Sequence, residues 1–199
     1  MVHSGFQGLY TVPMESSELN AGGKSPRDLI HSVLADVQKT RNVSKITSIG
    51  HSLGAAMAQL CAFDLVHSKV VGDIPVACFN WGGTRLGNKG FARKFDSYHP
   101  QLASLRMYNP SDFPTMPPVA LQYIFNGGFK HMGVPYSVSN TFMREAGMLA
   151  EGMDSNHNLE MHLKMIDSDR DLVMLNKAGN VLNKDLAKER QEAHHPQLA

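Results

Sequence analysis

Residues 45–58 of the chain read Lys-Ile-Thr-Ser-Ile-Gly-His-Ser-Leu-Gly-Ala-Ala-Met-Ala. The β-branched apolar residues of segment 46–49 predict a short buried strand. After the glycine-containing segment 50–54, apolar residues recur at helical spacing and predict a helix. These residues are Leu53, Ala56, Met57, Leu60 and Cys61. A strand that turns directly into a helix places Ser52 at the turn.

The pattern Gly-x-Ser-x-Gly between a strand and a helix is typical of a nucleophile elbow, in which a strained turn exposes the serine hydroxyl. The residues two before and two after the serine are expected to crowd its backbone. Glycine is therefore expected at both places, here Gly50 and Gly54, with His51 between the first glycine and the serine. The alternative that stays open is a serine that only caps the helix.

Composition limits the function classes. A chain of 199 residues predicts one domain with a sizeable core, and a net charge of +1 without a basic run argues against a nucleic-acid partner. Cys61 and Cys78 lie in apolar segments and are expected to be small buried residues rather than a disulfide pair. Neither a secretory leader nor a membrane span is found, so a soluble cytoplasmic protein is expected.

Strand and helix signals alternate along the chain. A serine, a proline and an acid start a helix over 25–41, whose inward face carries Leu29, Ile30, Val33, Leu34 and Val37. Strands are predicted at 74–81 and 104–108 with a helix at 89–98 between them, and a hairpin at 121–138 that breaks at Gly127-Gly128. This order predicts an α/β fold, a mostly parallel sheet with helices on both faces.

A serine nucleophile needs a base, and the base needs an acid that orients it. In α/β-hydrolases these residues follow one another as Ser, Asp or Glu, then His. Asp112, in a proline-bracketed turn after a strand, and His157, just before a helix, satisfy this order with Ser52. Asp112 bonding its own turn backbone is the alternative for the acid. The competing histidines are His131, His162 and His51.

Several further motifs, in matching order, resemble the class 3 (fungal-type) lipase family. They are Val2-His3-Ser4-Gly5-Phe6, residues 50–56, Gly82-Gly83-Thr84-Arg85-Leu86-Gly87-Asn88 and residues 109–118. The C-terminal part, with His157-Asn158-Leu159-Glu160 and Arg170-Asp171-Leu172-Val173, is similar to plant-type phospholipase A1 members. The resemblance implies a partial α/β-hydrolase domain over 1–182, followed by a charged tail over 183–199.

The same resemblance implies the site. Ser52 is expected to be the nucleophile, Asp112 the acid and His157 the base, and the Leu53 N–H one donor of the oxyanion hole. The family places a strand that ends in an Arg-Gly-Thr-like turn, and usually a lid helix, before the segment that matches Val2 to Phe6, and this chain shows neither. We therefore expect an N-terminally truncated domain, the loss of one oxyanion donor, and an exposed sheet edge beside the nucleophile strand.

The function implied is a serine carboxylic-ester hydrolase acting on lipids, of triacylglycerol lipase or phospholipase A1 type, through an acyl-enzyme. No metal or organic cofactor is expected. The expected partners are a lipid ester substrate at a membrane or droplet surface and, through the exposed edge, a second copy of the chain. The alternative is a lipase-like module, catalytically impaired by the missing donor, that binds lipid or a protein partner.

Overall fold

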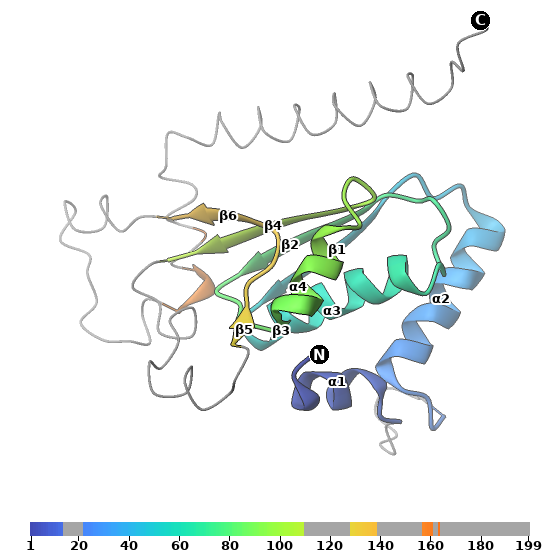
Figure 1. Ribbon diagram of the computed structural model, residues 1–199. Helices are drawn as coiled ribbons and strands as arrows, with labels where there is room; N and C mark the ends of the chain where they lie inside the picture. The colour runs from blue at the N-terminus through green and yellow to red at the C-terminus, as the bar shows by residue number, and fades with distance from the viewer. Residues whose placement is uncertain (14–21, 110–127, 139–156, 161–162, 164–199) are drawn as a thin grey trace, which may run out of the picture.

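The computed structural model describes residues 1–13, 22–109, 128–138, 157–160 and 163. Among these, the main sheet consists of parallel strands in the order β1-β2-β4-β6 (Figure 1). The strands are β1 (Ile46–His51), β2 (Val76–Trp81), β4 (Leu102–Tyr108) and β6 (Val134–Ser137). The predicted parallel sheet and the α/β class are confirmed. β1, which leads into Ser52, lies at an edge of the described sheet, as expected.

Helix α3 (Leu53–His67) covers one face of the sheet. Its alanines Ala55, Ala56 and Ala62 are fully buried, so the helix backbone can approach β1 and β2 closely. They join a core that also holds Phe91 and Phe95 of α4 (Lys89–Asp96). Helices covering the other face stay a prediction for residues outside the described ranges.

One of the apolar residues that predict α3 is largely exposed. Leu53 is 53% exposed, whereas Leu60, two turns later, is buried. The reason is geometric, because Leu53 is the first residue of α3 and the buried residues of the helix begin at Ala55. The predicted helix is therefore confirmed, but its first apolar residue is exposed.

Helix α2 (Pro26–Thr40) begins where the sequence predicts. Ser25 accepts a hydrogen bond from the Asp28 N–H at 3.1 Å and donates its hydroxyl to the Asp28 carboxylate at 2.7 Å. This side-chain hydrogen bond lowers the pKa of Asp28. Ile30 and Leu34 pack against the core, but Val33 is 59% exposed. The inward face is narrower than predicted because α2 touches the core along one edge.

Two features at the start and middle of the chain differ from the prediction. Residues Ser4–Thr11 form helix α1, which the sequence did not indicate because two glycines weaken its helical signal. The chain after Gly128 forms two short strands rather than the second arm of a hairpin. β5 (Phe129–Lys130) pairs with β3 (Gly87–Asn88), whereas β6 joins β4. The first arm lies outside the described residues.

The crossing from β5 to β6 explains that difference. Met132 is buried at 1% exposure, and Gly133 has a φ of +77°, a left-handed conformation that favours glycine. A Cβ added at Gly133 would lie 2.6 Å from Ser104 Oγ. The chain therefore passes tightly over β4, and this tertiary contact separates the two strands.

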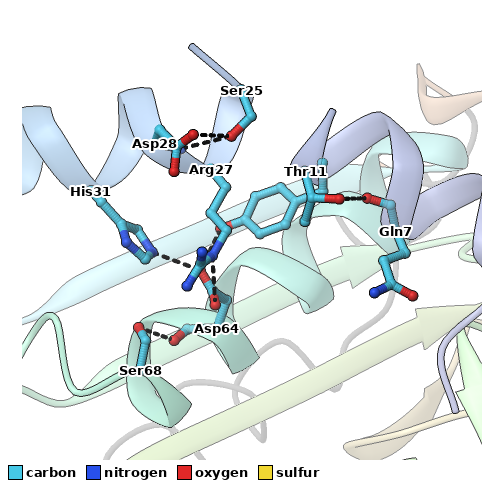
Figure 2. Close-up of polar contacts among 9 residues, drawn as sticks. Gln7, Thr11, Ser25, Arg27, Asp28, His31, Asp64 and Ser68 are labelled. Carbon is cyan, nitrogen blue, oxygen red and sulfur yellow. Dashed lines mark hydrogen bonds and ion pairs between the residues drawn. The ribbon is translucent and has the colours of Figure 1, made fainter. Parts of the chain in front are cut away.

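Asp64 on α3 joins three helices through its carboxylate (Figure 2). It accepts hydrogen bonds from the Tyr10 hydroxyl of α1 at 3.1 Å and from Arg27 Nε of α2 at 3.0 Å. His31 Nε2 of α2 lies 2.6 Å from the same carboxylate. Burial is the main cause that raises the pKa of Tyr10, so this residue stays protonated and donates. No local pattern in the sequence indicated this cluster.

Replacing Asp64 with alanine is expected to lower the free energy of unfolding by about 3 kcal/mol, because a half-buried arginine and a tyrosine hydroxyl lose their acceptor. Urea unfolding followed by circular dichroism measures it. Asp36→Ala is the matched control, since its ion pair with Lys39 has side chains 70% and 72% exposed and its loss should leave the midpoint unchanged. Equal shifts for both variants would contradict the assignment.

No helix among the described residues has the length and apolar character that crossing a membrane requires. The predicted boundary at residue 182 and the tail over 183–199 lie outside the described residues, and they stay predictions.

Candidate active site

Ser52 has the strained backbone expected of an elbow. Its φ of 56° and ψ of −122° lie outside the regions that non-glycine residues favour. It stands at the N-cap position of α3, yet its side chain makes no capping hydrogen bond. The alternative in which Ser52 only caps the helix is therefore wrong, and its hydroxyl is left to another partner.

The elbow requires glycine on one side of the serine only. A Cβ added at Gly50 would lie 2.1 Å from the carbonyl oxygen of Gly54 and 2.7 Å from Ala55 N. A Cβ added at Gly54 would meet no described atom within 4 Å. The close contact is between the end of β1 and the main chain of the first helical turn, so the prediction holds for Gly50 and is wrong for Gly54.

The partner of the serine is His157. Its Nε2 lies 2.6 Å from Ser52 Oγ, within the range for a hydroxyl that donates to an imidazole nitrogen. His157 directly precedes a helical turn at residues 159–160, where Asn158 Oδ1 accepts from the Glu160 N–H at 2.8 Å. The structure thus brings together two residues that are 105 positions apart.

The neighbouring strand fixes the elbow in place. The Ser52 N–H donates to the carbonyl of Trp81, the last residue of β2, at 3.0 Å. A Cβ added at Gly83 would lie 2.9 Å from the Cβ of Ala55. The Gly82-Gly83 turn after β2 is therefore small enough to let α3 begin beside it.

The other predicted site residues have different outcomes. Leu53 is the first residue of α3, where an N–H has no intrahelical acceptor. Asp112 and His162 lie outside the described residues. The last described residue before Asp112 is Asn109, which is buried and follows β4. Parallel strands bring their carboxyl ends to one edge of the sheet, so Asn109 lies on the same edge as the end of β1. His131 lies between β5 and β6.

Sequence reasoning missed one role at the site. It treated His51 as a rival base, but the Nε2 of this residue lies 2.8 Å from the main-chain carbonyl oxygen of His157. No local pattern could have signalled a contact between residues 106 positions apart.

The cysteines lie apart from this chemistry. Both are free thiols, and Cys78 is buried whereas Cys61 is only half-buried. Burial raises the pKa of the Cys78 thiol to about 11, so it remains protonated near neutral pH. The predicted role as buried apolar residues is confirmed for Cys78.

With this geometry in place, the comparisons identify the family. Residues 1–121 match the family model of class 3 lipases. The chain belongs to the class 3 lipase family. It is 34% identical over 152 residues to the chloroplastic phospholipase A1-Iα2 of Arabidopsis thaliana, covering 69% of this chain and 29% of that protein. It is 29% identical over 200 residues to phospholipase A1-II 1 of Oryza sativa subsp. indica, covering 94% and 48%.

A solved lipase from Rhizopus microsporus var. chinensis matches this class 3 lipase chain with a TM-score of 0.50 and 26% identity, covering 69% of this chain and 41% of that one. The likeness, the parallel sheet and the elbow agree with the predicted α/β-hydrolase fold. The chain spans less than half the length of each relative and of this lipase.

The expected cytoplasmic location is wrong. Among the relatives of the chain is the Arabidopsis thaliana phospholipase A1-Iα2, which is a chloroplastic protein, and this points away from the cytoplasm. The physical reason is that location is set by targeting signals, which are separate from the residues that build the fold. The core and elbow therefore carry no information on it.

Proposed function

We propose that the protein is a serine carboxylic-ester hydrolase that cleaves lipid esters, of triacylglycerol lipase or phospholipase A1 type. The observation that carries the proposal is the 2.6 Å contact between Ser52 Oγ and His157 Nε2 at a strained elbow. The relatives named as phospholipases A1 and the solved lipase support the substrate class.

In the proposed mechanism Ser52 Oγ attacks the acyl carbonyl carbon and its proton passes to His157 Nε2. The oxyanion that forms is held by the Leu53 N–H at the N-terminus of α3, where the helix dipole also favours negative charge. The intermediate then collapses, and the leaving alcohol takes the proton from His157. Water, deprotonated by His157, next attacks the acyl carbonyl of the acyl-enzyme. The bond to Ser52 Oγ then breaks, Ser52 Oγ takes the proton back from His157, and the fatty acid is released.

Asp112 is proposed to orient His157 and to stabilise its protonated form. This role follows from the order of the residues along the chain and from the position of Asn109 at the end of β4, on the edge of the sheet where Ser52 lies. The mechanism uses groups of the chain alone, so it requires neither a metal nor an organic cofactor.

Exposed apolar side chains near the proposed site suit a lipid surface. Leu53 follows the serine and is 53% exposed, and Leu159 and Leu163 follow the histidine at 39% and 49%. Single exposed leucines are ordinary, but here three follow the two reacting residues within a few positions. We propose that they contact acyl chains when the site meets a membrane or droplet surface.

The function is tested by labelling the purified protein with a fluorophosphonate probe and by hydrolysis of a short p-nitrophenyl ester. The wild-type protein is expected to be labelled and active, and Ser52→Ala to lose both while its circular dichroism spectrum is unchanged. Folded wild-type protein that is neither labelled nor active would instead favour a lipid- or partner-binding module.

Self-association through the edge strand is a further prediction. Ile49 on β1 is 63% exposed, and β1 has a strand neighbour on only one side among the described residues. Sedimentation velocity is expected to show a concentration-dependent dimer that Ile49→Lys weakens by about tenfold, because a charge on an edge strand disfavours pairing. A wild-type monomer at all concentrations would contradict the prediction.

A further inference from the structure

His51, the residue directly before Ser52, contacts the main chain of the proposed base. Its Nε2 lies 2.8 Å from the carbonyl oxygen of His157. A carbonyl oxygen only accepts hydrogen bonds, so the Nε2 of His51 must carry the proton and donate it. The contact therefore fixes the tautomer of His51 and ties the backbone of His157 to the end of β1.

The two imidazole rings also touch. Their centroids lie 4.9 Å apart and their planes are tilted by 34°. This second contact acts on the side chain of His157, whereas the hydrogen bond acts on its main chain. Together they restrict both the position of His157 and the orientation of its ring.

The support comes from a strand that is paired along its length. β1 is paired with β2 up to His51 and Trp81, and the Ser52 N–H donates to the Trp81 carbonyl. A single strand thus holds the nucleophile directly and reaches the base through the side chain of the preceding residue.

We propose that His51 is a positioning residue that holds His157 within hydrogen-bond reach of Ser52 Oγ. The proposal rests on the proposed function for its kinetic consequences. A base must lie about 2.6–3.2 Å from the proton it removes, and the Ser52–His157 distance of 2.6 Å meets this condition. A displacement of about 1 Å is enough to lower the rate about 100-fold.

Three substitutions separate the two contacts. His51→Gln keeps an N–H donor at about the place of the ring Nε2 but removes the ring, His51→Phe keeps a ring without the donor, and His51→Ala removes both. We expect His51→Ala to lower kcat for a p-nitrophenyl ester about 100-fold with KM changed less than about twofold. His51→Gln should regain about tenfold of that loss.

His67→Phe is the matched control. His67 also bonds a neighbouring side chain, the Tyr98 hydroxyl, and stacks on the ring of Phe63. It lies at the other end of α3, about 20 Å along the helix from Ser52, so kcat is expected to be unchanged.

A second measurement does not depend on activity. In ¹⁵N-histidine NMR spectra, with the His157 signals assigned from His157→Gln, wild-type His157 should give one sharp set of ring signals. These signals should shift or broaden in His51→Ala and His51→Phe and remain sharp in His67→Phe. His51→Phe, which lacks the donor but keeps a ring, serves if the alanine variant does not fold.

The outcomes distinguish the two proposals. If the His157 signals are disturbed in His51→Ala and His51→Phe but the wild-type protein shows no esterase activity, the positioning role is supported and the enzyme is rejected. Unchanged His157 signals and unchanged kcat in His51→Phe overturn the positioning role and leave the enzyme intact. The positioning role is also overturned if His51→Ala lowers kcat, His51→Gln does not regain it, and the His157 signals are intact in both variants.

Discussion

Replacing His157 with glutamine is expected to lower kcat/KM for a p-nitrophenyl ester by about 10⁴- to 10⁶-fold. Glutamine places an amide near the position of the ring Nε2 but cannot take up a proton, so the Ser52 hydroxyl is left unactivated. The contact that motivates the change is the 2.6 Å distance between His157 Nε2 and Ser52 Oγ. Initial rates of ester hydrolysis and the rate of fluorophosphonate labelling both report the loss.

His131→Gln is the control for this prediction, because His131 was the rival base. It lies between β5 and β6, and its replacement is expected to change kcat/KM by less than about threefold, because the contact with Ser52 Oγ is made by His157. If His131→Gln abolished labelling while His157→Gln kept it, the roles of the two histidines would be reversed.

Replacing Gly50 with alanine is expected to disrupt the elbow. The new Cβ would lie 2.1 Å from the Gly54 oxygen and 2.4 Å from the Gly54 carbonyl carbon. These are main-chain atoms of a helix, so they cannot move aside as a flexible side chain would. The free energy of unfolding should fall by about 3 kcal/mol, and Tm by about 6–12 °C for a chain of this size.

Activity should fall at least about 100-fold in the same variant, because the collision shifts Ser52 relative to His157. Gly54→Ala is the matched control. Its Cβ would contact no described residue outside its own helix, and alanine is the better helix former, so the variant should be as stable as the wild type or more stable by up to about 1 kcal/mol. Thermal unfolding and probe labelling of both variants compare the two effects, and a Gly50→Ala protein as active as Gly54→Ala would contradict the collision.

The elbow could be predicted from the sequence because its signals are local. The strand 46–49, the turn and the helix that follows lie within one short segment, and the start of α2 at Ser25 is equally local. The choice of His157 required more than local pattern. It relied on the order of residues along the chain and on the resemblance to class 3 lipases, and the contact with Ser52 agrees with it.

The features that the sequence analysis predicted wrongly or missed depend on contacts between distant segments. The sequence could not show that Val33 and Leu53 remain exposed, because burial depends on which helix edge touches the core. It could not show that β5 and β6 pair with different strands, since the tight passage of Gly133 over Ser104 decides their partners. The cluster around Asp64 could not be predicted from the sequence either, because its members come from three helices.

The sequence by itself determined that a strand would end in an elbow with Ser52 at its turn, because the backbone strain and helix start are encoded within a few residues. Only the tertiary structure decided which flanking glycine is required and which side chain supports the base. Those outcomes depend on contacts between Gly50 and the first turn of α3, and between His51 and a residue 106 positions away. The distances between the contacting atoms are set by how β1, α3 and the segment that carries His157 pack together.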